Sequence, residues 1–130
     1  MKYERSLLFG RWFREEIEGS NKKIVEYAYF SADGSCEFTF VTLNLAVGKS
    51  ESMVEQITEL GDWGLVGDIH FTITKEEIID EKLYSTDLNN SDNYHAYKVL
   101  TLNHQVFKYQ HIDTNETYVL RKITDNIGHC

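Results

Sequence analysis

The sequence has no proline, only 8 glycines and 2 cysteines among its 130 residues. Two cysteines, Cys36 and Cys130, make a poor disulfide framework, and we interpret Cys36 as a small buried hydrophobic residue. A disulfide between the two stays open as an alternative. No apolar run approaches the ~20 residues that span a membrane, and the first residues lack a signal-peptide pattern. We therefore expect a cytoplasmic protein.

Positive charge is scarce and scattered. The chain has 13 Lys and Arg against 21 Asp and Glu, a formal net charge of −8. Its basic runs, Lys22-Lys23 and Arg121-Lys122, are two residues long. Nucleic acids and anionic membranes reward clusters of Lys and Arg, so we expect neither as a partner.

Motifs of catalysis and of metal binding are also missing. The sequence has no nucleophile elbow, no phosphate-binding glycine loop and no histidine near Cys36. We therefore expect no metal and no cofactor and find no catalytic residue, and an enzymatic role stays open. The histidines are dispersed, without the spacing of metal ligands: His70, His95, His104, His111 and His129.

Aromatic residues, by contrast, are plentiful at 13%, and they recur in short alternating runs. Asp33-Gly34 separates two such runs, 23–31 and 36–45, which is a strong hairpin signal. Further runs at 69–74, 95–102, 105–112 and 117–123 follow, with turn residues between the last three. The pattern predicts a single all-β domain over 1–130, an antiparallel up-and-down barrel of roughly eight to ten strands.

Two segments fit a helix as well as a strand. Residues 52–60 combine a Ser52/Glu55 capping box with apolar residues at helical spacing, and 75–84 is rich in helix formers. We interpret both as strands, because a helix inserted between neighbouring strands of a meander is the costlier topology.

The two ends of the chain carry a family resemblance. Gly10 and Trp12 open the first strand as Gly-x-Trp, and Arg121 lies in the last strand. The chain thus resembles the lipocalin-like, or calycin, superfamily, and small bacterial lipocalin-like domains above all. The resemblance implies that Trp12 plugs one barrel end and that Arg121 packs on its indole. Residues 14–27 run directly into a second strand, so the helical insert of intracellular fatty-acid-binding proteins, and their carboxylate site, are not expected.

The final meander yields candidate site residues. If Leu102 pairs with Gln105, and Asp113 with Glu116, one aromatic-rich face of these strands points inward. On this register Arg121 starts outward and must curl under the barrel end to reach Trp12. The polar members of the inward face are candidate ligand anchors, and four phenylalanines are candidate walls: Lys98, Tyr109, His111 and Tyr118, with Phe107, Phe38, Phe40 and Phe71.

These features favour non-catalytic binding of a small hydrophobic or amphipathic ligand in the barrel mouth. The alternative is a protein-interaction or inhibitory module whose barrel is filled by side chains. The apolar residues before Gly10 could form a short plug helix or a homodimer contact: Tyr3, Leu7, Leu8 and Phe9.

Overall fold

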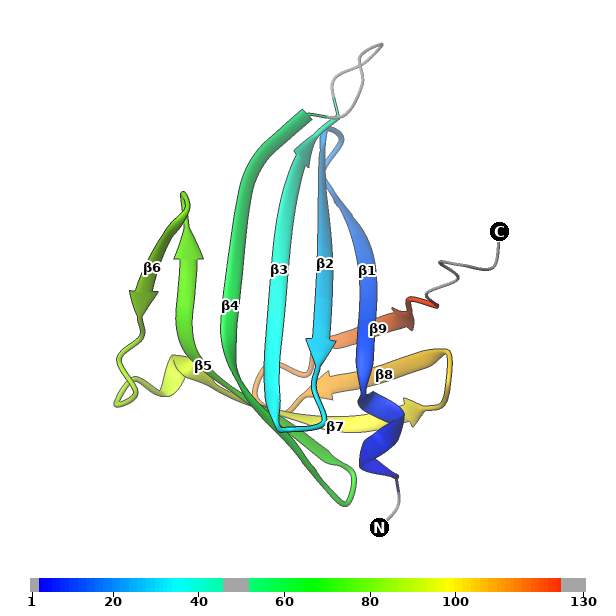
Figure 1. Ribbon diagram of the computed structural model, residues 1–130. Coiled ribbons are helices and arrows are strands. Elements are labelled where there is room, and N and C mark those ends of the chain that lie inside the picture. Colours follow the sequence, from blue (N-terminus) through cyan, green and yellow to red (C-terminus); the bar gives the residue numbers. More distant parts are fainter. Residues whose placement is uncertain (1–2, 46–51, 125–130) are drawn as a thin grey trace.

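A computed structural model describes residues 3–45 and 52–124 of the chain (Figure 1). Cys130 and His129 lie outside these described residues. The elements are two 3-10 turns, η1 (Arg5–Leu8) and η2 (Ser91–Asn93), and the strands β1 (Gly10–Glu18), β2 (Lys22–Phe30), β3 (Ser35–Asn44), β4 (Ser52–Val66), β5 (Ile69–Ile79), β6 (Lys82–Ser85), β7 (Tyr94–Leu102), β8 (Val106–His111) and β9 (Thr117–Lys122).

The strands form one antiparallel sheet in the order β4-β3-β2-β1-β9-β8-β7-β5-β6, and β4 also pairs with β5. Eight of the nine strands therefore close into an up-and-down barrel, and β6 extends from β5 as a hairpin. This confirms the predicted fold, including the strand interpretation of 52–60 and 75–84. The short N-terminal helix is a single 3-10 turn of 4 residues.

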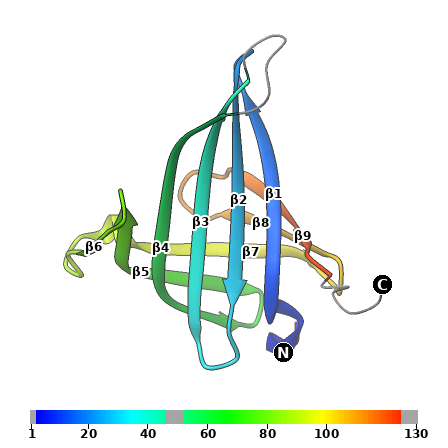
Figure 2. The same cartoon turned by 45° about the horizontal axis from the view of Figure 1, so that its top comes forward.

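Closure of the barrel is uneven along its length. Strand β1 pairs with β2 over all nine of its residues but with β9 only at Trp12 and Phe13. In Figures 1 and 2 the long strands β1 to β4 stand side by side and extend past the level at which β7, β8 and β9 cross behind them. One barrel end is thus closed by neighbouring strands, while the other opens on one side.

Trp12 fills the closed end, as the resemblance implies, but its basic partner is Lys122. Trp12 is fully buried, and its indole Nε1–H donates a hydrogen bond to the carbonyl oxygen of Leu8 at 2.9 Å. The Lys122 ammonium lies 4.7 Å from the Trp12 ring centroid and donates to the carbonyl oxygen of Phe9. Arg121 is exposed and pairs with Phe13 on the outer face. Because neighbouring strand residues point to opposite faces, only Lys122 reaches the indole.

Gly10 makes room for this contact. Its φ is +111°, and a Cβ there would lie 2.8 Å from the Lys122 ammonium nitrogen. Any other residue would be strained in this backbone conformation and would also collide with the lysine. The Gly-x-Trp motif therefore supports the plug through both of its residues.

A second tryptophan closes the same end. Trp63 is buried, and its Nε1–H donates to the carbonyl oxygen of Ser31 at 2.9 Å. The guanidinium of Arg5, from η1, lies 4.4 Å from the Trp63 ring centroid and donates to the carbonyl oxygen of Ala32 at 3.0 Å. The residues before β1 thus act as a lid on the plug. Cys36 is buried in the same core, where burial raises the pKa of its thiol to about 12.

The register of β7 differs from the expected one because of a β-bulge. Tyr97 pairs with His111 and Val99 with Tyr109, but beyond the bulge Thr101 pairs with Lys108. The extra residue, Leu100, shifts the strand by one position, so each side chain before it changes face. Tyr97 and Val99 therefore share the inward face with Tyr109, and Lys98 lies on the outer one. Between β8 and β9 the pairing Tyr109↔Tyr118 keeps the expected inward set.

Candidate ligand-binding site

A cavity of about 240 Å³ lies inside the barrel above the plug. Its walls come from β1, β2, β3, β4, β5, β7, β8 and β9, so every strand of the closed barrel contributes. It is lined by Arg14, Glu26, Phe30, Phe38, Phe40, Glu59, His70, Thr72, His95, Tyr97, Tyr109 and Tyr118.

Four of the eight sequence-predicted ligand residues line this cavity: Tyr109, Tyr118, Phe38 and Phe40. The structure places Phe107 below them, fully buried in the plug, with its ring centroid 5.9 Å from that of Trp12. It belongs to the floor on which the cavity rests.

The other three predicted residues lie elsewhere. Lys98 is exposed on the outer face because of the bulge at Leu100. Phe71 covers Gly64 of the paired strand β4, away from the lumen. His111 uses its Nδ1 to accept hydrogen bonds from the backbone N–H groups of the β8–β9 turn, at 3.1 and 3.3 Å.

Tyrosine and phenylalanine rings form the apolar part of the wall. The ring centroids of Tyr97 and Tyr109 are 4.9 Å apart, and those of Tyr109 and Tyr118 are 5.5 Å apart. Phe38 and Phe40 stack at 6.5 Å on the facing strand. Burial raises the pKa of Tyr109 and of Tyr97, and raises that of Tyr118 to about 12, so all three hydroxyls are protonated at neutral pH.

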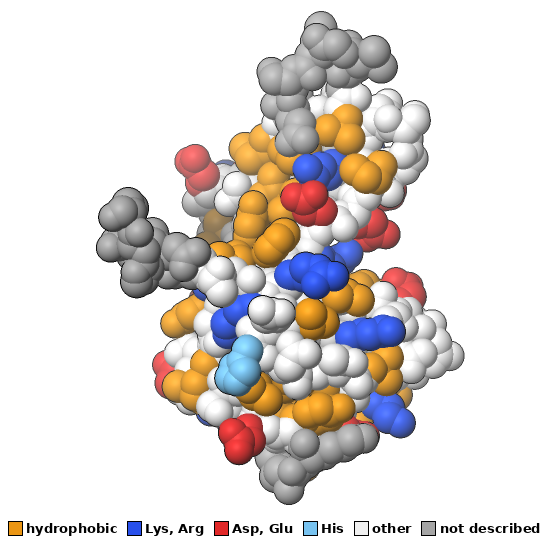
Figure 3. Space-filling model, turned by 90° about the vertical axis from the view of Figure 1, so that its right-hand side faces the viewer, with side chains coloured by type: hydrophobic (Ala, Val, Ile, Leu, Met, Phe, Trp, Pro, Cys, Tyr) orange, Lys and Arg blue, Asp and Glu red, His pale blue; other side chains and the backbone are white. Residues whose placement is uncertain are grey.

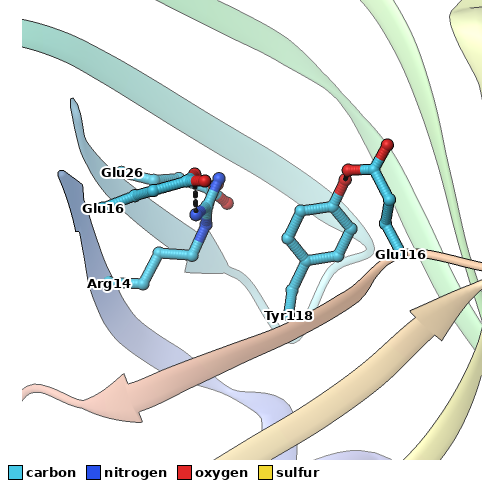
Figure 4. Close-up of polar contacts among 5 residues, drawn as sticks. All are labelled: Arg14, Glu16, Glu26, Glu116 and Tyr118. Atoms are coloured by element: carbon cyan, nitrogen blue, oxygen red, sulfur yellow. Dashed lines mark hydrogen bonds and ion pairs between the residues drawn. The ribbon is translucent and has the colours of Figure 1, made fainter. Parts of the chain in front are cut away.

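A charged cluster lies beside these rings (Figure 4). Arg14 donates from Nε to Glu26 Oε1 at 2.8 Å and from Nη1 to Glu16 Oε2 at 3.1 Å. Its guanidinium carbon lies 5.0 Å from the Tyr118 ring centroid. Glu26 is only 5% exposed, and its burial raises the pKa of the carboxyl although Arg14 partly offsets this.

Glu59 brings a second carboxylate to the cavity lining, beside Glu26. Its Oε1 lies 3.4 Å from the Thr74 hydroxyl. Glu77 is its cross-strand partner. Burial first, and then repulsion from Glu77, raises the pKa of Glu59.

The alternation of side chains along β1 could have placed Arg14 in the cavity from the sequence alone. Arg14 and Glu16 follow Trp12 at steps of two along β1, so an inward Trp12 places both side chains on the inner face. The same alternation places Glu59 on the face of the buried Trp63, four residues further along β4, because the register shift beside Gly61 comes from an extra residue of β5, Lys75.

His70 forms part of the cavity floor and is the most enclosed polar residue there. It is 2% exposed, and its ring packs against those of Phe30 and Phe107, each with a centroid distance of 5.2 Å. Burial lowers the pKa of His70 to about 3, so the ring is neutral. Its Nδ1 has no hydrogen-bond partner among the described residues. A single sequence could not place this residue at the floor.

The outer surface of the barrel has a hollow of its own. A hollow of about 490 Å³ lies outside the barrel over β1, β2 and β3, next to the exposed Tyr27 and Tyr29. On the side shown in Figure 3, Lys and Arg side chains lie among hydrophobic ones. No helix in the described ranges is long and apolar enough to cross a membrane.

Comparisons with known proteins bear on the fold. A scan against protein-family models finds no match, and a search of curated proteins finds none either. Four chains of solved structures match, among them a lipocalin-like protein from Bacteroides uniformis ATCC 8492. It has a TM-score of 0.47 and 16% identity over 90% of this chain and 99% of that chain. That similarity concerns the fold alone. The order of this chain's own strands is that of an antiparallel up-and-down barrel.

Proposed function

We propose that the protein binds a small amphipathic molecule in the barrel cavity, without transforming it. The main support is that side chains fill only one end of the barrel. Trp12, Phe107 and the residues around them fill one end, whereas above them the barrel leaves a cavity of about 240 Å³. Ligand sites combine such an apolar wall with a few convergent polar groups.

The size of the cavity limits the ligand. At about 30 Å³ for each water of bulk liquid, 240 Å³ corresponds to roughly eight waters. This volume suits a single-ring or short-chain molecule, and a long acyl chain would extend out of the barrel. The cavity meets the open edge of β1, where Arg14 to Glu18 pair only with β2, and we propose this edge as the entrance.

A binding role also fits the chemistry of the lining. The buried thiol of Cys36 is not among the lining residues, and its raised pKa keeps it protonated at neutral pH. The tyrosine hydroxyls are protonated and His70 is neutral, so these groups offer hydrogen bonds and aromatic surface.

The test is a fragment screen by two-dimensional NMR on the full chain. We expect one-ring fragments to shift the resonances of Tyr97, Tyr109 and Tyr118. Phe40→Trp, which adds volume inside the cavity, should abolish these shifts, whereas Tyr27→Trp on the outer face should leave them unchanged. Shifts confined to the outer face, or none at millimolar fragment, would overturn the proposal.

The alternative, a protein-interaction module, has one specific observation in its favour. Tyr27 and Tyr29 are 47% and 41% exposed beside the outer hollow, and the Arg11 guanidinium lies 6.0 Å from the Tyr29 ring centroid. Exposed tyrosine and arginine are typical of interface hot spots. If this face forms a homodimer, light scattering will give twice the monomer mass for the wild type and the monomer mass for Tyr29→Ser.

A further inference from the structure

The balance of charge in the cavity lining is negative. One guanidinium, that of Arg14, faces the carboxylates of Glu16 and Glu26. Glu26 and Glu59 line the cavity, and Glu16 lies at the exposed end of the cluster outside the lining. With these groups ionised, the lining carries one positive and two negative charges, and the positive one is already paired with carboxylates.

Arg14 is already engaged and is a poor anchor for a ligand carboxylate. Its Nε and Nη1 are bonded to two different glutamates, and its planar face lies over Tyr118. An anion that displaced Glu26 would leave a buried carboxylate without its partner, which is strongly unfavourable.

Glu59, in contrast, has no basic group among those that shift its pKa in the described part of the chain. The charged groups that shift its pKa are two other carboxylates, Glu77 and Glu26, and its hydrogen bond to Thr74 is long. Keeping a half-buried carboxylate among like charges costs stability unless a cation completes the site.

The unpartnered nitrogen at the floor independently indicates a hydrogen-bond donor. A neutral imidazole has one N–H donor and one acceptor nitrogen. The hydrogen bond between His70 and the Gly64 backbone acts to raise the pKa of the ring. A bond that the ring donates to a carbonyl oxygen has this effect, so the ring is the donor. This bond uses the ring's N–H, so Nδ1 is a buried acceptor, on a residue of the cavity lining, without a donor among the described residues.

The aromatic walls fit the same chemistry. Tyr97, Tyr109 and Tyr118 on one side and Phe38 and Phe40 on the other present ring faces and edges to the cavity. A ligand cation within about 6 Å of such a ring face is stabilised by the ring quadrupole, and more so in a desolvated site.

We infer that the ligand of this cavity is a small organic cation, an ammonium on an aromatic or short aliphatic body. Glu59 provides the counter-charge, His70 Nδ1 accepts an N–H, and the rings surround the apolar part. This inference rests on the proposed function and specifies its ligand class.

Three probes with one apolar body and different head groups test it: 2-phenylethylamine, 2-phenylethanol and 3-phenylpropionate. Isothermal titration calorimetry at pH 7 and low salt gives the affinities. We expect the amine to bind at least about tenfold more tightly than the alcohol, as a charged hydrogen bond implies, and the carboxylate to bind most weakly.

Variants identify the responsible carboxylate. Glu59→Gln should weaken the amine about tenfold, the loss of one charge-assisted hydrogen bond, and leave the alcohol unchanged. Glu37→Gln, on the outer face of β3, is the matched control and should change neither affinity. Should Glu59→Gln fail to fold, Glu59→Ala, which also removes the carboxylate, replaces it and should likewise weaken the amine selectively.

The outcomes separate the two proposals. If the alcohol or the carboxylate binds as tightly as the amine, the cation inference is overturned and the binding function stands. Equal amine affinity in the wild type and in the glutamine variants likewise overturns it. If none of the three probes binds at millimolar concentration and the NMR screen is also silent, both proposals fail together.

Discussion

The Lys122 ammonium lies over the Trp12 indole, 4.7 Å from its centroid, and donates to the carbonyl oxygen of Phe9 just before the first strand. A residue of the last described strand thus joins the residues before the first strand at the point where the barrel closes. This contact combines a cation–π interaction with a charge-assisted hydrogen bond, and burial lowers the pKa of Lys122.

Replacing Lys122 by Met should lower the free energy of unfolding by about 1–2 kcal/mol, because both interactions are lost while the apolar stem remains. Arg121→Met, one residue earlier but exposed, should change it by less than about 0.5 kcal/mol. Chemical denaturation of both variants measures the difference. Equal losses would show that the two residues share the closure.

Gly61 and Gly64 of β4 form a second matched pair. A Cβ at Gly61 would lie 1.7 Å from the carbonyl oxygen of Ile73 in the neighbouring strand, which is backbone and cannot move aside. We expect Gly61→Ala to cost at least about 3 kcal/mol or to prevent folding. A Cβ at Gly64 would meet the end of the Phe71 ring, which can rotate, so Gly64→Ala should cost about 1 kcal/mol. Thermal unfolding of the two variants checks the order.

His70 should make stability depend on pH. Its pKa of about 3 in the folded protein lies below the ordinary value of 6.5, so the unfolded chain binds the additional proton between these values. The stability that the neutral ring contributes is therefore fully present above pH 6.5 and is lost as the pH falls toward 3. The free energy of unfolding of His70→Phe, measured across this range, should lack that part of the decline. An unchanged slope would mean that the ring is protonated in the folded state.

Glu59 should act in the opposite direction. Its folded pKa is raised, so the folded protein holds the proton more tightly and loses stability as the pH rises from about 4.5 through the folded pKa. Relative to wild type, Glu59→Gln should thus gain stability between pH 4 and pH 7. Denaturation at the two pH values tests this, with exposed Glu37→Gln as the control. A variant less stable than wild type at pH 7 would show that Glu59 has a stabilising partner.

Much of the fold could be predicted from the sequence because strand alternation and turn chemistry are local. Asp33-Gly34 marks a real hairpin, and Trp12 occupies the plug as its motif implies. The β8–β9 faces also agree, since a pairing shift of two residues leaves each side chain on its face.

The site was harder to predict. Inward and outward side chains are assigned by alternation along a strand, and one inserted residue reverses the assignment for every residue beyond it. The bulge at Leu100 exchanged Lys98 for Tyr97 in the lumen, and a second irregularity adds Lys75 to β5 opposite Leu60 and Gly61. The position of His70 depends on how distant strands meet in the closed barrel. None of these relationships has a period-2 signature.

The bulge at Leu100 also sets which charge β7 offers to the lumen. Val99↔Tyr109 and Thr101↔Lys108 stand on either side of it, so removing Leu100 would leave these pairs in place, with Tyr97 inside and Lys98 outside. A regular ladder that kept Leu100 would instead turn Lys98 inward, and a cavity of carboxylates and rings would then contain an ammonium of its own. One accommodated extra residue, with no substitution in the lining, thus keeps a lysine out of the cavity.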